Sequence, residues 1–101
     1  MAVMQLSNDT FREFIQSPEP VLVDFYATWC SPCKALSPVL EEFAAETGAA
    51  IGMVDVDEEQ DLAEEYEVMS VPTLLVFQNG EILETAVGVP TKADLLDMLG
   101  K

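Results

Sequence analysis

The 101-residue chain contains no histidine, only two cysteines and only four basic residues, and its formal net charge at pH 7 is -15. So few lysines and arginines form no cationic patch that could neutralise nucleic-acid phosphates or hold the chain on an anionic membrane. No apolar run is long enough to cross a membrane, and the first residues lack the features of a signal peptide. We therefore expect a cytoplasmic protein whose partners include neither nucleic acid nor membrane.

The remaining composition is that of a folded domain. Half of the residues are apolar and eight are aromatic, whereas disordered chains combine high charge with low hydrophobicity. The length suits one hydrophobic core and is too short for two. We expect a single domain over residues 1–101.

Hydrophobic spacing and turn residues predict helices that alternate with strands. Helices are predicted from Ser7 to before Pro18, after Cys30 to Gly48 with an interruption at Pro38, over 57–67, and from a Thr91 cap to Gly100; strands are predicted over 21–27 and 51–56 and as a hairpin of 73–77 and 81–87 around Asn79-Gly80. A helix between the two central strands favours a parallel crossover. The predicted fold is a three-layer α/β domain with a mixed central sheet.

Both cysteines lie in the stretch WCSPCK, at Cys30 and Cys33. A structural disulfide that closes so short a loop contributes only about 2 kcal/mol in the chain-entropy model, and a reducing cytosol would not keep it oxidised. A structural zinc site needs four ligands, which here would require a dimer that shares ligands. Two unrelated buried thiols are a third alternative, because a single Cys-x-x-Cys is a short pattern.

The position of the pair, between a buried strand and a helix, favours redox chemistry. Residues three apart inside a helix have Cβ atoms about 5 to 6 Å apart, too far for the ~3.8 Å of a disulfide, so Cys30 must occupy the non-helical cap position. There the helix N–H groups and dipole favour a thiolate without a histidine base. Pro32 is tolerated in the first turn. Cys33 is expected to be more buried and harder to ionise.

Several segments together resemble the thioredoxin family, in the right order and over essentially the whole chain. They are VDFYATWCSPCK at 23–34, Pro38, Ser70-Val71-Pro72-Thr73, Asn79-Gly80 and Gly88. The resemblance implies the thioredoxin fold and a protein-disulfide reductase that carries electrons as a monomer. Its implied partners are disulfide-containing proteins and a thioredoxin reductase that reduces it again. It calls for no cofactor and no metal.

The resemblance also assigns catalytic roles. Cys30 is implied to attack the substrate disulfide and Cys33 to resolve the mixed disulfide. Asp24 matches the buried carboxylate that accepts the Cys33 proton through water, the alternative being a strand carboxylate paired with a buried donor. Pro72 matches the cis-proline that faces the disulfide.

Five further residues match the substrate-binding surface of the family: Trp29, Ser31, Pro32, Val71 and Gly88. The Val71 backbone is implied to bind an extended substrate strand. For Trp29, packing in the core is the alternative.

Three residues depart from the family pattern. Ser31 stands where glycine is usual, which bears on the redox potential, and Tyr26 replaces a frequent tryptophan. Met53 stands where many members carry a lysine near the buried aspartate. Two other functions stay open: a binding module of the same fold with secondary redox activity, and a dedicated oxidant or isomerase.

Overall fold

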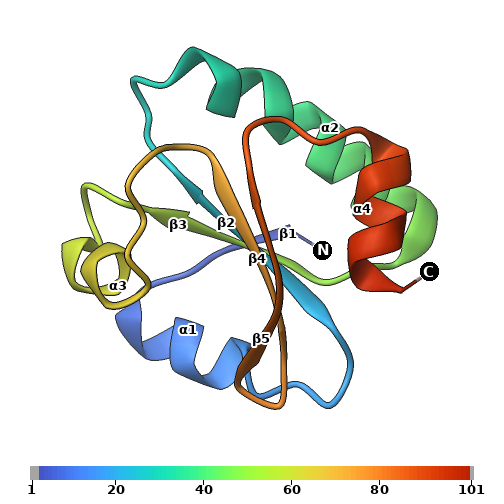
Figure 1. The fold of residues 1–101 in the computed structure, drawn as a ribbon, viewed down its shortest axis with the longest axis horizontal. Helices are drawn as coiled ribbons and strands as arrows, with labels where there is room; N and C mark the ends of the chain where they lie inside the picture. Colours follow the sequence, from blue (N-terminus) through green and yellow to red (C-terminus); the bar gives the residue numbers. More distant parts are fainter. Residues whose placement is uncertain (1–2, 101) are drawn as a thin grey trace.

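The computed structural model describes residues 3–100 as helices that alternate with strands (Figure 1). In chain order the elements are β1 (Val3–Gln5), α1 (Asn8–Phe14), β2 (Val21–Tyr26), α2 (Ser31–Thr47), β3 (Ile51–Asp55), α3 (Gln60–Glu65), β4 (Thr73–Gln78), β5 (Glu81–Val87) and α4 (Lys92–Leu99).

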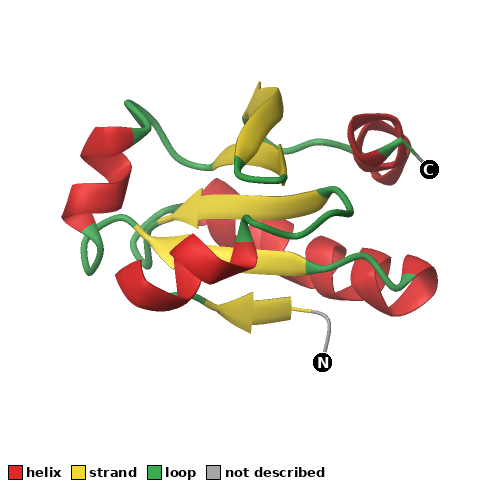
Figure 2. Cartoon of the chain, turned by 90° about the horizontal axis from the view of Figure 1, so that it is seen from below, coloured by secondary structure: helices red, strands yellow, loops and turns green. Residues whose placement is uncertain are grey.

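The five strands form one mixed sheet in the order β1-β3-β2-β4-β5. The strands β1, β3 and β2 run parallel, whereas β4 is antiparallel to both β2 and β5. Figure 2 shows them stacked in this order, from β1 beside the N-terminus to β5 on the far side. The predicted crossover and hairpin are both confirmed, with Asn79 and Gly80 at positive φ in the turn.

Apolar residues on both faces of the sheet pack against helices, which gives the predicted three layers. On one face α1 and α3 contribute Phe11, Ile15 and Leu62 to a core with Val23, Phe25 and Phe77 of the sheet. On the other face α2 and α4 contribute Leu36, Leu40, Phe43, Leu95 and Leu99 to a core with Leu22, Leu74 and Val76. Since side chains alternate along a strand, even-numbered residues of β2 face α2 and α4.

The predicted helix ends are confirmed where cap residues mark them. Ser7 and Thr91 each accept a hydrogen bond from the third backbone N–H of their helix in a capping box. Gly48 ends α2 in the left-handed conformation, and Pro38 lies inside that helix. The long α2 therefore begins at the cysteine pair and covers one face of the sheet.

Several expectations about the elements were wrong. The first helix was expected to reach Pro18, but α1 ends at Phe14, because the Ile15 and Ser17 carbonyls accept the N–H groups of Gly80 and Asn79 in the hairpin turn. The first element of the described residues is strand β1, which was not predicted because three residues, two of them exposed, carry no readable alternation. The acidic helix is shorter than 57–67: α3 begins at Gln60, because the Asp55 side chain accepts the N–H groups of Asp57 and Glu58 and holds those residues in a turn. The strands predicted over 21–27 and 51–56 each end one residue earlier.

Candidate active site

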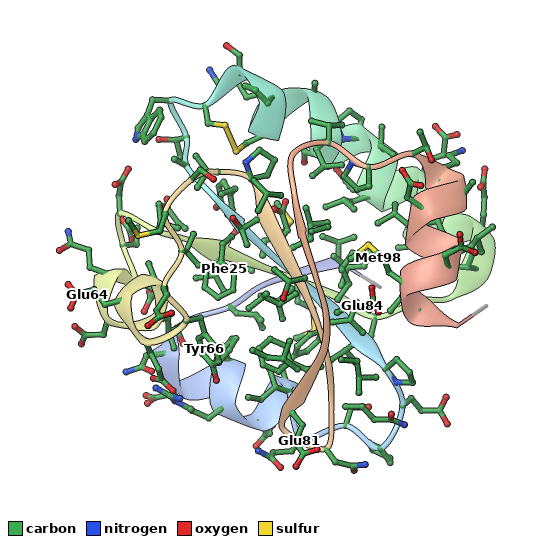
Figure 3. The ribbon with its side chains drawn as sticks, viewed as in Figure 1. Phe25, Glu64, Tyr66, Glu81, Glu84 and Met98 are labelled. Carbon is green, nitrogen blue, oxygen red and sulfur yellow. A yellow bond between two sulfur atoms is a disulfide. The ribbon has the colours of Figure 1, made fainter. Side chains whose placement is uncertain are left out.

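The cysteine pair lies where the loop after β2 leads into α2, and the two residues form a disulfide there (Figure 3). Cys30 caps α2 with extended dihedrals, φ -92° and ψ 114°, and its Cα lies 5.3 Å from that of Cys33. The prediction that Cys30 occupies the non-helical cap is confirmed. The Cys33 N–H donates a hydrogen bond of 3.2 Å to Cys30 Sγ, so the start of the helix points a backbone donor at this sulfur.

Both cysteines are buried in this oxidised state. Cys30 is 4% exposed and Cys33 is 3% exposed, so the expected difference in burial is only slight in the disulfide form. The reason is the cover over the disulfide: Cys30 Sγ lies 3.7 Å from the Val71 carbonyl oxygen, and Ala27 and Val56 pack beside the pair. What distinguishes the two sulfurs is their position on the helix.

The loop before β4 forms this cover. The Val71-Pro72 peptide bond is cis, as the resemblance implied. Thr73 Oγ1 donates to the Ser70 carbonyl, which fixes the turn, and the Gly88 N–H donates to the Pro72 carbonyl at 3.0 Å. This hydrogen bond holds Gly88 beside Pro72. The preceding residue, Val71, contacts the disulfide, so Gly88 lies close to it as well.

Trp29, Ser31 and Pro32 form the exposed side of the site. Trp29 is 68% exposed, so the alternative that it packs in the core was wrong. Its indole N–H donates a 2.9 Å hydrogen bond to Asp57 Oδ2, which holds the ring at the surface. Ser31 and Pro32 are exposed in the first turn of α2, directly after Cys30.

Asp24 is fully buried on the face of the sheet that α2 covers. Its neighbours in register are Met53 on β3 and Leu74 on β4, both apolar. Neither carboxylate oxygen has a hydrogen-bond partner among residues 3–100, so the alternative of a paired strand carboxylate was wrong. Loss of hydration with nothing to offset it raises the pKa of Asp24 from its ordinary 3.8 to about 7.

A hollow of about 360 Å³ opens beside Cys33 and Met53. Tyr26, Lys34 and Ser37 line it as well, and Met53 is the register partner of Asp24, which does not line the hollow itself. Tyr26 donates to Gln5 Oε1 at this rim. The tyrosine that replaces the frequent tryptophan therefore links β2 to β1 through its hydroxyl.

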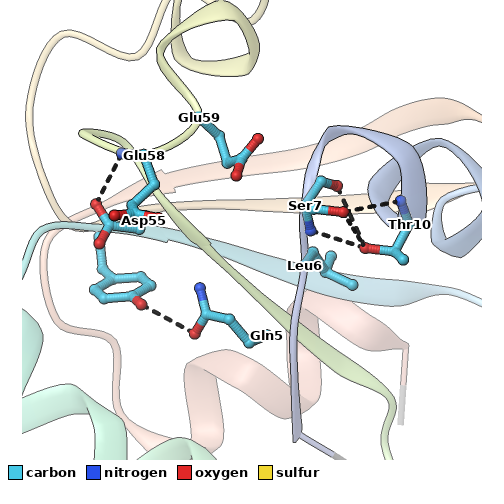
Figure 4. A pocket seen from close by; sticks show the side chains of 8 residues that line it. Gln5, Leu6, Ser7, Thr10, Asp55, Glu58 and Glu59 are labelled. Carbon is cyan, nitrogen blue, oxygen red and sulfur yellow. Dashed lines mark hydrogen bonds between the residues drawn. The ribbon is translucent and has the colours of Figure 1, made fainter.

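A second hollow is lined by the carboxylates of Asp55, Glu58 and Glu59, two of which accept backbone N–H groups (Figure 4). Asp55 accepts the N–H groups of its own turn, and Glu59 accepts the Asn8 N–H. No group of three residues of metal-ligand type within residues 3–100 is arranged to hold an ion. In the same part of the chain, no helix combines the length and hydropathy needed to span a bilayer.

Sequence reasoning missed Asp57 as the partner of Trp29. A usable signal was present: β2 and β3 are parallel, so the residues that follow them, including Trp29 and Asp57, emerge at the same edge of the sheet.

Comparison with known proteins agrees with this geometry. The family model described as thioredoxin matches residues 2–101. Proteins named thioredoxin from Staphylococcus haemolyticus and Staphylococcus aureus are 47% and 46% identical over 103 aligned residues, covering 100% of this chain and 98% of each relative.

Solved structures agree as well. A mutant thioredoxin from Halobacterium salinarum is 42% identical with a TM-score of 0.86, covering 96% of this chain and 87% of that one. The thioredoxin of Malassezia sympodialis is 33% identical with a TM-score of 0.86, covering 99% and 92%. The protein therefore has the thioredoxin fold and belongs to the thioredoxin family of thiol-disulfide oxidoreductases.

Proposed function

We propose that the protein is a general protein-disulfide reductase in which Cys30 is the nucleophile. The observation that carries the proposal is the position of Cys30 at the start of α2, where the Cys33 N–H donates to its sulfur. The Cys30 thiolate attacks one sulfur of a substrate disulfide, a mixed disulfide forms, and the other substrate sulfur leaves as a thiolate. Helix N–H groups stabilise the charge that the attacking sulfur carries.

Cys33 resolves the mixed disulfide. Its thiol loses a proton to the Asp24 carboxylate through water, and the resulting thiolate attacks Cys30 Sγ. The Cys30–Cys33 disulfide forms, the second substrate thiolate is released, and two electrons have passed to the substrate. Support for Asp24 as the acceptor comes from its burial, its unpartnered oxygens and its pKa of about 7, which suits a base near neutral pH.

The substrate docks across the exposed side of the site. An extended segment pairs with the Val71 backbone beside Pro72, which faces the disulfide, and contacts Trp29, Ser31 and Pro32 on one side and Gly88 on the other. The placement of Trp29 at the surface and of Gly88 beside Pro72 supports this arrangement.

The cycle closes when a thioredoxin reductase reduces the Cys30–Cys33 disulfide again. In this proposal the protein works as a monomer in the cytoplasm, a compartment in which protein thiols are kept reduced. No cofactor or metal takes part, since the two cysteines carry both electrons.

The test compares two variants as traps for substrate proteins. Cys33→Ser retains attack by Cys30 and lacks resolution, so it should accumulate stable mixed disulfides with a model disulfide protein. Cys30→Ser should accumulate few under the same conditions. Equal trapping by both variants would contradict the assigned roles. Equilibration of the wild type with a dithiothreitol redox buffer separates a reductase from an oxidant or isomerase, since only a reductase has a strongly reducing couple.

A further inference from the structure

A third hollow, of about 350 Å³, lies between the end of β5 and α4. Its apolar lining comes from Val87, Val89, Pro90 and Met98, and Asp94 and Asp97 of α4 line it as well. Figure 3 shows Met98 extending from α4 toward β5, with Glu84 of β5 reaching toward the same helix. The hollow therefore combines an apolar lining with two acidic residues.

This hollow is continuous with the proposed substrate site. Gly88 lines it, and the Gly88 N–H donates to the Pro72 carbonyl. The neighbouring Val71 carbonyl lies 3.7 Å from Cys30 Sγ. A substrate segment that passes over Cys30 and Gly88 therefore reaches the hollow within a few residues.

The walls leave apolar surface without cover. Val87 is 67% exposed and Val89 is 49% exposed, and both lie next to Gly88. Met98 adds a flexible thioether, a side chain that adapts to varied shapes. Such a wall suits the alkyl part of a long side chain.

No basic side chain pairs with the Asp94 or Asp97 carboxylate within the described residues. Asp97 has no ion pair and no side-chain hydrogen bond within the described residues 3–100, whereas Asp94 is held in place by the Thr91 N–H. The nearby Lys92 ammonium is engaged by Glu42 and Glu46 on α2. Asp94 and Asp97 are both exposed, and no cation pairs with either carboxylate within residues 3–100.

We propose that this hollow binds the side chain of a lysine or arginine that lies a few residues from the reactive cysteine of a substrate protein. The alkyl stem packs on Val87, Val89 and Met98, and the charged head pairs with Asp97 and Asp94. A second copy of the chain is disfavoured as the occupant because each copy carries a net charge of -15. The proposal rests on the disulfide-reductase function and adds a preference among its substrates.

The test uses otherwise identical unstructured peptides whose single cysteine is in a mixed disulfide with a small thiol. One lysine is moved from about two to about six residues from the cysteine on either side, spanning about 7 to 20 Å, and the reference peptide carries glutamine instead. The fully reduced protein should reduce the lysine peptides about 2- to 5-fold faster at one or two positions only. Added salt should diminish the gain.

Variants assign the gain to the hollow. Asp97→Asn should reduce it and Asp94→Asn/Asp97→Asn should abolish it, while the rate on the glutamine peptide stays unchanged. Asp97→Lys should favour a glutamate peptide at the same position. Asp9→Asn removes an equal charge on α1, away from the hollow, and should leave the gain intact.

Two results would overturn the subsite alone: equal rates for all peptides, or a gain that is uniform along the peptide and falls as much in Asp9→Asn as in Asp97→Asn. Failure to reduce any peptide, glutamine included, would overturn the reductase function and the subsite with it.

Discussion

The backbone N–H of Cys33 donates a 3.2 Å hydrogen bond to Cys30 Sγ, which links the two cysteines a second time beside their disulfide. We expect the same donor to face the Cys30 thiolate in the reduced protein, where the helix dipole adds to its effect. A helix terminus supplies up to about 2 kcal/mol in favour of a negative charge, which favours the thiolate over the thiol. Cys33 lies inside the helix and lacks this position.

The first prediction is that iodoacetamide modifies Cys30 before Cys33 in the reduced protein near neutral pH. Both cysteines are almost equally buried in the oxidised state, so the difference has to come from the thiolate fraction, which the helix start raises at Cys30. Peptide mapping after partial alkylation measures it, with Cys33→Ser as the control for the Cys30 rate. Faster labelling of Cys33 would reverse the roles.

The second prediction concerns the stability of Asp24→Asn. Because the folded pKa of Asp24 is about 7 against an ordinary 3.8, the folded state holds this proton more tightly than the unfolded state. The contribution of Asp24 to the free energy of unfolding should be highest below the ordinary value, fall as pH rises, and be lowest above about 7. At pH 8 Asp24→Asn should raise the free energy of unfolding by about 2 to 4 kcal/mol relative to the wild type, and at pH 3 by about zero.

Denaturant melts of the oxidised protein at both pH values measure this difference. Asp9→Asn, an exposed carboxyl in the first turn of α1, is the control and should show no comparable gain at pH 8. An unchanged or lower stability of Asp24→Asn at pH 8 would mean that the carboxylate is solvated or paired in solution.

The third prediction is kinetic. If Asp24 accepts the Cys33 proton, resolution of the mixed disulfide should accelerate as pH rises through about 7, the pKa of Asp24, because only the carboxylate accepts. Asp24→Asn should slow this step by about 100-fold or more and abolish that part of its pH dependence. Stopped-flow release of the second thiol from a preformed mixed disulfide isolates the step. An Asp24→Asn profile with the wild-type shape would assign the proton to another acceptor.

The sequence predicted most of this site because its residues occupy local positions that leave patterns. A strand that runs into WCSPCK places Cys30 at a helix start, and cap residues such as Ser7 and Thr91 mark helix ends through nearby hydrogen bonds. The isolation of Asp24 was also predictable, because Met53 replaces the usual lysine and a strand that is apolar on both faces leaves the carboxylate no partner.

What the sequence did not predict depends on contacts between distant segments. Strand β1 pairs with β3 from a distant part of the chain, and Leu6, which follows β1, is buried. The near-equal burial of the cysteines depends on the loop at Val71, which covers Cys30 from a distant part of the chain. The hydrogen bond between Trp29 and Asp57 requires the register of two strands. None of these leaves a periodic pattern in the chain.

The fourth prediction tests how tightly Leu6, the residue after β1, packs against β3. A Cβ added to Gly52 on β3 would collide with the Leu6 side chain and lie 3.1 Å from Phe14 Cε2. Gly52→Ala should therefore lower the free energy of unfolding by about 1 to 3 kcal/mol, through overpacking. In a double-mutant cycle with Leu6→Ala, which removes the colliding atoms, the Gly52→Ala loss should shrink. A full loss in the Leu6→Ala background would mean that the contact with Phe14 or strain in β3, and not Leu6, is the cause.

The last prediction concerns Met53, the register partner of Asp24 on β3. Met53→Lys brings an ammonium to the face that holds the unpartnered carboxylate, and the hollow beside Met53 gives the longer side chain room. An opposite charge favours the ionised form, so the pKa of Asp24 should fall from about 7 toward its ordinary value of 3.8. The loss of stability with rising pH and the acceleration of resolution should both move to lower pH.

Met53→Gln is the matched control, of similar length and without charge. Carbon NMR titration of the Asp24 carboxyl, assigned with Asp24→Asn, reads the pKa directly. An equal shift in Met53→Gln would attribute the change to hydration, and no shift in either variant would show that residue 53 does not control the proton of Asp24.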